Sequence, residues 1–362
     1  MPRFRPGRTG RTPAGVVIAG LIGVALSQSA CTTVSYYTQS VAGQLRLIAA
    51  RRPVADLIHD PHTPEGLRER LLKARAIRDF ASRELALPDN ASYRGYVDLG
   101  RRYVVWSVIA TPEFSLTPRT WCFPVAGCVS YRGYFAESDA RRFGAALSAE
   151  GMDVYVAGVE AYSTLGWFAD PLLNTMLAQP DWRLAGTLFH ELAHQRLYVS
   201  GDTAFNEAFA VTVEREGLRR WFVASGESGQ QARYRRVRSR RRAFLELLGA
   251  TRKKLNRVYA SADPDSLKRR AKRRVFTELR AAYARLKARW GGDGRYDGWF
   301  EMPLNNARLA LVATYNAQVP ALQRLLARSG GDLATFYAAC DRLARLDKVD
   351  RQARLRRLAG AD

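Results

Sequence analysis

The sequence predicts an α+β fold, in which a mixed sheet and a helix carrying an HExxH motif are followed by a mostly helical C-terminal part. Three observations lead to this prediction. Residues 63–87 and 231–290 place apolar side chains at helical spacing, residues 92–135 carry Tyr, Val and Trp between turn residues, and residues 187–201 contain the motif. With 362 residues and 47% hydrophobic content, the chain can bury a sizeable core, which excludes general disorder.

Residues 1–30 have the pattern of a bacterial export signal. The basic start contains arginines and no acid, and the apolar run VVIAGLIGVAL that follows is too short to span a bilayer comfortably. Ser29 and Ala30 then precede Cys31, which resembles the lipobox of bacterial lipoproteins, where the cysteine receives lipid. We therefore expect an exported protein that is anchored to the membrane through Cys31 and faces the periplasm. Ordinary signal cleavage, with Cys31 incidental, and an uncleaved anchor are the alternatives.

The other cysteines fit an exported protein. Cys122 and Cys128 are close enough in sequence to close a short loop, and an oxidising compartment favours a disulfide between them. Cys340 lies in a stretch with helical spacing and has no obvious partner, so we expect a buried thiol there.

Helical and strand-like patterns alternate before the motif. Periodicity predicts helices over 63–87 and 138–151, with strands over 92–135 between them. Residues 152–168, MDVYVAGVEAYSTLGWF, predict a strand that runs into a loop. This strand alternates well enough to lie at a sheet edge and hold a substrate backbone.

The motif helix is predicted from about Trp182 to Tyr198. Asp181 follows Pro180 and can cap the start of this helix, and Gly201 lies just beyond its end. The prediction places the motif in the second half of an amphipathic helix.

His190 and His194 are one turn apart on the same face of this helix, so both imidazoles can reach one tetrahedral ion. Glu191 then lies beside the ion without binding it. This is the arrangement of HExxH zinc peptidases, in which the glutamate acts as general base on a zinc-activated water that attacks the scissile carbonyl.

A zinc site of this kind needs a third protein ligand. No histidine follows His194, and His59 and His62 lie in a predicted exposed turn, so the third ligand should be a carboxylate. A second helix, capped by Asp202 or Thr203, would place Glu207 in its opening turns and Glu214 two turns further along the same face. Glu207 is the first choice for the third ligand and Glu214 the second.

The segments HELAHQ and FNEAFAVTVEREG resemble the HExxH and NExxA motifs of glutamate-zincin peptidases related to aminopeptidase N. The chain is more similar to a family of predicted bacterial aminopeptidases, often lipoproteins. That similarity covers nearly the whole mature chain, including CVSYRGYF, AYSTLGWF, FHELAHQRLYV and PLNNARLALVATYNAQVP. The resemblance implies a zincin-like mixed sheet, one Zn²⁺ ion, and Glu207 as the third zinc ligand.

The resemblance also implies further site residues. Glu160 resembles the acid that reads the free amine of a substrate in aminopeptidase N, and Tyr162 beside it is the second residue expected to bind substrate. Relatives use a downstream tyrosine or histidine to stabilise the oxyanion, which carries over to Tyr315, with Tyr296 as its rival. A surface acid is the alternative for Glu160, and a core position is the alternative for either Tyr315 or Tyr296.

The net charge of +23 is concentrated in residues 231–290, which predict an antiparallel pair of basic helices around a break at SADPDS. An exported protein rarely meets nucleic acid, so phosphates of anionic lipid or lipopolysaccharide are the expected neighbours of this surface. A solvated face is the alternative.

We divide the chain into a signal peptide (1–30), a zincin-like catalytic region (31–230) and a helical C-terminal region (231–362). The predicted function is a zinc aminopeptidase of the cell envelope that acts on peptides. A zinc endopeptidase on the same site, and a noncatalytic envelope protein that binds anionic lipid through its basic helices, are the alternatives.

Overall fold

The computed structural model describes residues 36–123, 127–161, 163–313 and 318–360. Cys31, Tyr162 and Tyr315 lie outside these residues. The chain divides into two compact units, Met1–Arg46 and Leu47–Asp362, and residues 36–46 of the first unit are helical. Within the part of the chain that the structure describes, no helix has the combination of length and apolar character that a membrane crossing requires.

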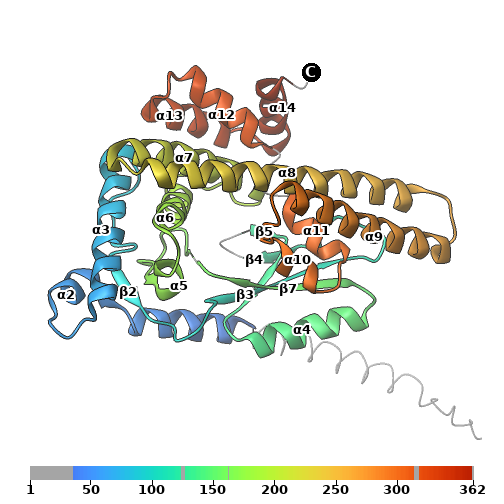
Figure 1. The fold of residues 1–362 in the computed structure, drawn as a ribbon, viewed down its shortest axis with the longest axis horizontal. Coiled ribbons are helices and arrows are strands. Elements are labelled where there is room, and N and C mark those ends of the chain that lie inside the picture. Colours follow the sequence, from blue (N-terminus) through green and yellow to red (C-terminus); the bar gives the residue numbers. More distant parts are fainter. Residues whose placement is uncertain (1–35, 124–126, 162, 314–317, 361–362) are drawn as a thin grey trace, which may run out of the picture. The chain divides into compact units, whose positions relative to one another are not determined.

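The second unit combines helices with small sheets, which confirms the α+β class (Figure 1). Its first half contains β1 (Arg52–Pro53), α2 (Val54–His59), α3 (Glu65–Leu85), β2 (Gly95–Val97), β3 (Val105–Thr111), β4 (Trp121–Phe123), β5 (Gly127–Val129), β6 (Arg132–Tyr134), α4 (Glu137–Ala149), β7 (Asp153–Val159), β8 (Leu172–Leu173) and α5 (Asn174–Leu177). The helices α6 (Asp181–Arg196), α7 (Thr203–Ser225), α8 (Ser228–Ala260), α9 (Asp265–Arg289), α10 (Asp297–Glu301), α11 (Asn306–Ala313), α12 (Val319–Arg328), α13 (Leu333–Ala344) and α14 (Lys348–Ala359) follow.

Three small sheets hold the strands. β2 pairs antiparallel with β1 and parallel with β8, so this sheet is mixed, and β4 pairs with β5. The third sheet has the order β6–β3–β7, which places β7 at an edge, as its sequence pattern indicated. Side chains alternate between the two faces of this sheet: Val154 and Val156 lie under Gly144 of α4, whereas Tyr155 contacts Arg308 of α11. Helices therefore cover both of its faces.

The hairpin of β4 and β5 joins Cys122 to Cys128 through a disulfide bond. The two cysteines face one another across the hairpin. Cys340 on α13 is a buried free thiol, in agreement with its apolar helical surroundings in the sequence.

Helices α3, α6 and α7 share one apolar core. Phe189 on α6 and Phe209 on α7 are fully buried, and α6 lies directly beneath α7 (Figure 1). Gly217 of α7 allows this close packing, because an added Cβ would lie 2.7 Å from both Leu85 and Phe189. The packing fixes the two helices that carry the HExxH and NExxA motifs.

The start of α6 differs from the prediction. Asp181 is the first residue inside the helix and does not cap it. Its carboxylate instead forms ion pairs with Arg70 and Lys73 of α3. Arg70 also donates to the carbonyls of Leu177 and Gln179, at 2.9 and 2.7 Å. These bonds attach α3 to the start of the motif helix.

The loop between α6 and α7 is fixed by two polar residues. Asp202 caps α7, as expected, by accepting from the N–H of Phe205, and it also forms a buried ion pair of 2.8 Å with Arg351 of α14. Asn206, the asparagine of the NExxA motif, donates to the carbonyl of Val199 and accepts from its N–H, both at 2.8 Å. The loop therefore has a defined path from one motif to the next.

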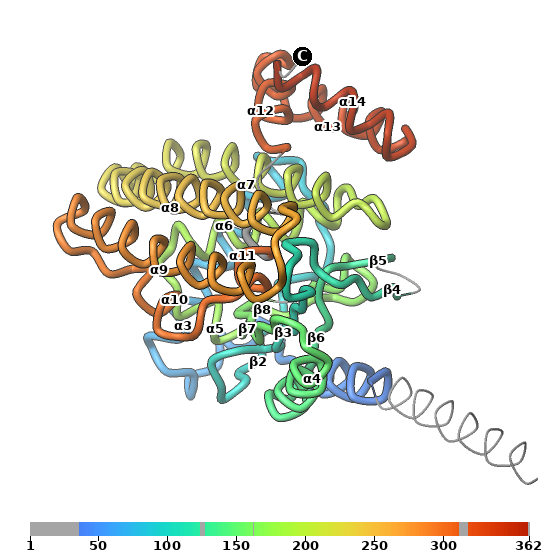
Figure 2. The backbone as a smooth tube through the Cα atoms, turned by 90° about the vertical axis from the view of Figure 1, so that its right-hand side faces the viewer, coloured from blue at the N-terminus to red at the C-terminus, as the bar shows by residue number. Residues whose placement is uncertain are grey.

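The basic helices α8 and α9 pack side by side in both views (Figures 1 and 2). Their contacts run in opposite directions along the chain: Arg240 donates to the carbonyl of Trp290, and Lys254 pairs with Glu278. The pair is thus antiparallel, as predicted. The expected boundary at residues 230 and 231 lies inside α8, and the described residues from 231 to 360 contain helices but no strand.

Candidate metal centre

Two adjacent helices bring His190, His194 and Glu207 together. The histidines are one turn apart on α6, and Glu207 lies in the second turn of α7, which begins just after the fixed loop. One nitrogen or oxygen atom from each of the three side chains falls within 4.8 Å of the others. His194 is buried, and His190 and Glu207 are largely buried, with 20% and 15% of their side chains exposed.

The distances within this cluster suit a small tetrahedral cation. The Nε2 atoms of His190 and His194 are 3.2 Å apart; Oε2 of Glu207 lies 3.3 Å from the first, and Oε1, the other oxygen of the same carboxylate, lies 3.6 Å from the second. Ligands about 2.0–2.1 Å from a tetrahedral zinc ion are separated from one another by roughly 3.3 Å. Two neutral imidazoles and one carboxylate are also the donor types of zinc sites in hydrolases. The residues present therefore fit a zinc ion.

Glu214 lies on the other side of His190. Its Oε2 is 3.2 Å from Nδ1 of His190, whereas Glu207 faces Nε2 of the same ring. Burial by itself lowers the pKa of His190, but the hydrogen bonds with Glu207 and Glu214 raise it well above its usual value. Burial, together with the charge of His190, lowers the pKa of His194 to about 4. Glu214 thus contacts a histidine of the cluster and is not a member of it.

Glu191 is partly buried and lies near several other carboxylates. Burial raises its pKa to about 7; the charge of His190 opposes this shift, and the carboxylates of Glu207, Asp170 and Glu214 add to it. A general base works best with a pKa near the working pH. A dication beside Glu191 would lower this pKa, because an adjacent positive charge favours the carboxylate.

The sequence did not single out Tyr93, which lies close to Glu191. The side chain is 2% exposed, and burial followed by the charges of Glu191 and Asp170 raises the pKa of its hydroxyl well above the usual range. Its backbone φ is +62°, a conformation that is strained for an aromatic residue. A strained φ in the middle of ASYRGYV leaves no recognisable trace in the sequence.

Gln195, the residue after the second histidine, connects the motif helix to the loops beneath it. Its amide donates to Asp170 at 3.1 Å and to Ser92 at 3.2 Å, and its Oε1 accepts from Asn90 at 2.8 Å. Asp170 is fully buried and also accepts from the N–H and hydroxyl of Thr164. This network holds residues 90–93 and 163–170 against α6.

The structure does not join Glu160 to the cluster. Its carboxylate accepts hydrogen bonds from Gln179 at 3.0 Å and from Arg183 at 3.2 Å, near the start of α6. Arg183 precedes His190 by about two helical turns. If Glu160 recognised the amine of a substrate, its carboxylate would have to bind both this amine and Arg183.

Of the other predicted residues, two lie outside the described part of the chain and three lie within it. Tyr162 and Tyr315 lie outside the described residues, so their expected roles in substrate binding and oxyanion stabilisation stay predictions. Tyr296, the rival of Tyr315, is partly buried and stacks on the core residue Phe244 of α8, with ring centroids 3.9 Å apart. His59 and His62 are both exposed, but only His62, whose side chain is 92% exposed and bonds to Asp60, lies in a turn as expected. His59 is instead the last residue of α2, where its ring bonds to the carbonyl oxygen of Ala55.

A second tyrosine, Tyr198, lies near the cluster at the end of the motif segment. Burial and the charge of Glu207 raise the pKa of its hydroxyl. Tyr93 and Tyr198 are therefore close enough to the acids of the site to respond to their charges.

Comparison with known proteins identifies the family of the chain. No curated protein and no solved structure matches the chain. One family, described as "Putative aminopeptidase", matches residues 35–355, a range that includes both motif helices and most of the chain. The protein belongs to this aminopeptidase family and is a peptidase.

Proposed function

We propose that this protein is a zinc aminopeptidase of the bacterial cell envelope. The observation that carries the proposal is the convergence of His190, His194 and Glu207, whose nitrogen and oxygen atoms approach one another to 3.2–3.6 Å, close to the separation of zinc ligands. The family match supports a peptidase, and the partly buried Glu191, next to His190 in the sequence, is the proposed base for peptide hydrolysis.

In this proposal the three side chains hold one zinc ion, which supplies a Lewis acid that polarises a carbonyl and makes a water more acidic. The Glu191 carboxylate accepts the proton of the attacking water and passes it to the leaving amine. Glu214 keeps His190 in the tautomer with a free Nε2 by accepting from Nδ1. Tyr315 is the proposed oxyanion donor.

An endopeptidase on the same site is the second candidate, and Glu160 is the observation that favours it. An aminopeptidase must read the charged amine of its substrate, but the carboxylate of Glu160 is already paired with Arg183. An internal peptide bond needs no such acid. In this reading Glu160 has a structural role at the start of α6.

Matched peptides with free and acetylated N-termini test the proposal. An aminopeptidase releases the first residue of the free peptide and leaves the acetylated one intact, whereas an endopeptidase cleaves both internally. A chelator should stop either reaction, and added zinc should restore it. If the protein cleaves neither peptide, or if a chelator has no effect on cleavage, the proposal is wrong.

The envelope location rests on the N-terminal pattern and on the disulfide. A bond between Cys122 and Cys128 fits an oxidising compartment, and Cys31 is the proposed site of lipid attachment. Mass spectrometry of the mature protein should find Cys31 as a diacylglycerol-modified N-terminus. An unmodified N-terminus at another residue would contradict the anchor and would leave the peptidase proposal untouched.

A further inference from the structure

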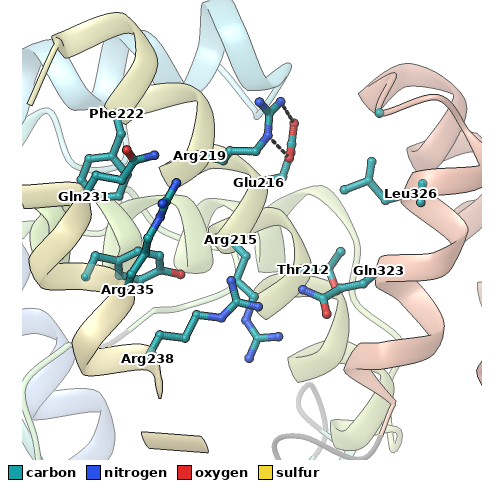
Figure 3. A pocket seen from close by; sticks show the side chains of 13 residues that line it. Thr212, Arg215, Glu216, Arg219, Phe222, Gln231, Arg235, Arg238, Gln323 and Leu326 are labelled. Carbon is teal, nitrogen blue, oxygen red and sulfur yellow. Dashed lines mark hydrogen bonds and ion pairs between the residues drawn. The ribbon is translucent and has the colours of Figure 1, made fainter. Parts of the chain in front are cut away.

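A pocket of about 460 Å³ lies between α7, α8 and α12, apart from the candidate metal centre. Figure 3 shows arginines from two of these helices pointing into it, with Gln323 of α12 on the far side. The arginines are Arg215 and Arg219 of α7 and Arg235 and Arg238 of α8. Phe222 and Leu326 add an apolar wall. The pocket thus combines a strongly cationic lining with space for a small group.

The positive charge in this pocket is not balanced by the protein. Glu216 is the acid in the lining, and its carboxylate is already bonded to Arg219 and Arg220 at 2.7–2.8 Å. Arg215, Arg235 and Arg238 form no hydrogen bond or ion pair with any residue that the structure describes. Burial, followed by the nearby charge of Arg238, lowers the pKa of Arg215. An anion would relieve this repulsion.

We propose that this pocket binds a phosphate group. Its unpaired guanidinium groups come from two helices, and those of Arg215 and Arg238 lie near one another, while Arg235 lines another part of the pocket. Guanidinium forks match the oxygens of phosphate. A single carboxylate would engage one fork and leave the other arginines unpaired. The phosphate is either that of a small soluble molecule or that of a lipid headgroup, and the two share the same chemistry at the pocket.

The pocket and the metal centre use different residues of α7. Glu207 and Glu214 face α6, while Thr212, Arg215 and Arg219 line the pocket. The two sites are neighbours on α7, and the charge of Glu214 acts on Arg215. The phosphate proposal needs neither zinc nor peptidase activity, so direct titration tests it separately from the proposed function.

The test is calorimetric titration of the full mature protein with inorganic phosphate, at constant ionic strength and with chloride as the reference anion. The double variant Arg235→Gln/Arg238→Gln removes two pocket charges. Arg233→Gln/Arg236→Gln is the matched control, because both residues are exposed on the same helix and lie outside the pocket lining. Arg215→Gln tests the contribution of α7. All three proteins should unfold at the temperature of the wild type.

We expect saturable phosphate binding that weakens about tenfold or more in the pocket pair and in Arg215→Gln, and less than about twofold in the control pair. Vesicles containing phosphatidylglycerol, compared with phosphatidylcholine vesicles, form the second arm. If free phosphate binds with this dependence, the ligand is a soluble phosphate. If only the phosphatidylglycerol vesicles bind, with the same dependence on the variants, the ligand is a lipid headgroup. Equal weakening in both double variants, or no binding in either arm, would overturn the proposal.

Discussion

Nδ1 of His190 lies 3.2 Å from Oε2 of Glu214, while Nε2 of the same ring faces Glu207 at 3.3 Å. The two glutamates are seven residues apart on α7 and so reach the two nitrogens of one imidazole. A carboxylate that accepts from Nδ1 leaves Nε2 with its lone pair directed toward His194 and Glu207. The two contacts distinguish the two glutamates that the sequence left as candidates for the third ligand: Glu207 lies on the Nε2 side of the ring and Glu214 on the Nδ1 side.

Removing Glu214 should weaken zinc binding without abolishing it. Partners that orient a histidine ligand typically contribute a factor of about 10–100 in metal affinity, and Glu214→Ala is expected to fall in that range. Glu214→Gln should lose less zinc affinity than Glu214→Ala, because the amide oxygen can still accept a hydrogen bond from Nδ1. Competition with a zinc chelator of known affinity measures both values. A Glu214→Ala protein with wild-type zinc affinity would show that the contact does not orient the ring.

Glu191→Gln should separate metal binding from catalysis. The amide cannot accept the water's proton, so we expect a loss of about 100-fold or more in kcat with zinc content unchanged. Single-turnover hydrolysis of a free peptide and metal analysis of the same sample provide the two readings. Loss of zinc in this variant would make Glu191 a ligand, contrary to the role proposed here.

The buried pair of Arg351 and Asp202 should stabilise the loop between the motif helices. Arg351→Met leaves the Asp202 carboxylate without its partner at 2% side-chain exposure, and loss of one partner of a buried ion pair typically costs about 3–5 kcal/mol. Denaturant unfolding measures this change. Arg354→Met, an exposed change on the same helix, is the control and should alter the free energy of unfolding by less than about 0.5 kcal/mol.

The contact between Asp181 and Arg70 should give a pH-dependent contribution to stability. Burial raises the pKa of Asp181, but the hydrogen bonds and charges of Arg70 and Lys73 together outweigh it, and the net shift is downward. A carboxyl with a lowered folded-state pKa stabilises the fold above its unfolded pKa, and this stabilisation disappears as the pH falls through the folded-state value.

The Asp181→Asn variant should therefore be less stable than the wild type by about 1 kcal/mol at pH 7, since solvent screens part of the interaction. The difference should shrink below about pH 4. Asp139→Asn removes an exposed helical pair with Arg142 and should show a smaller effect. A difference for Asp181→Asn that stays constant between pH 7 and pH 3 would mean that charge plays no part in this contact.

The sequence predicted those features that depend on local periodicity and motif spacing. The α+β class, the helices over 63–87 and 182–198, the edge position of β7 and the antiparallel basic pair follow from such patterns. The convergence of His190, His194 and Glu207 was also accessible, because helical spacing and a short loop restrict where the second helix can lie.

Features that depend on contacts distant in sequence were not accessible. The carboxylate of Asp181 bonds to Arg70, more than a hundred residues away, and local capping rules do not include such a competitor. The arginine that pairs with Glu160 and the strained conformation of Tyr93 depend in the same way on tertiary packing. The cationic pocket could not be predicted, because it depends on how three helices lie relative to one another.

The zinc content of the purified protein and of three variants tests the central claim most directly. We predict about one zinc ion per chain in the wild type, with most of it lost in Glu207→Ala and in His194→Ala, and with Glu214→Ala retaining zinc at saturating concentration. A wild type that binds no zinc, or a Glu207→Ala protein that keeps full zinc while Glu214→Ala loses it, would contradict the assignment of these residues.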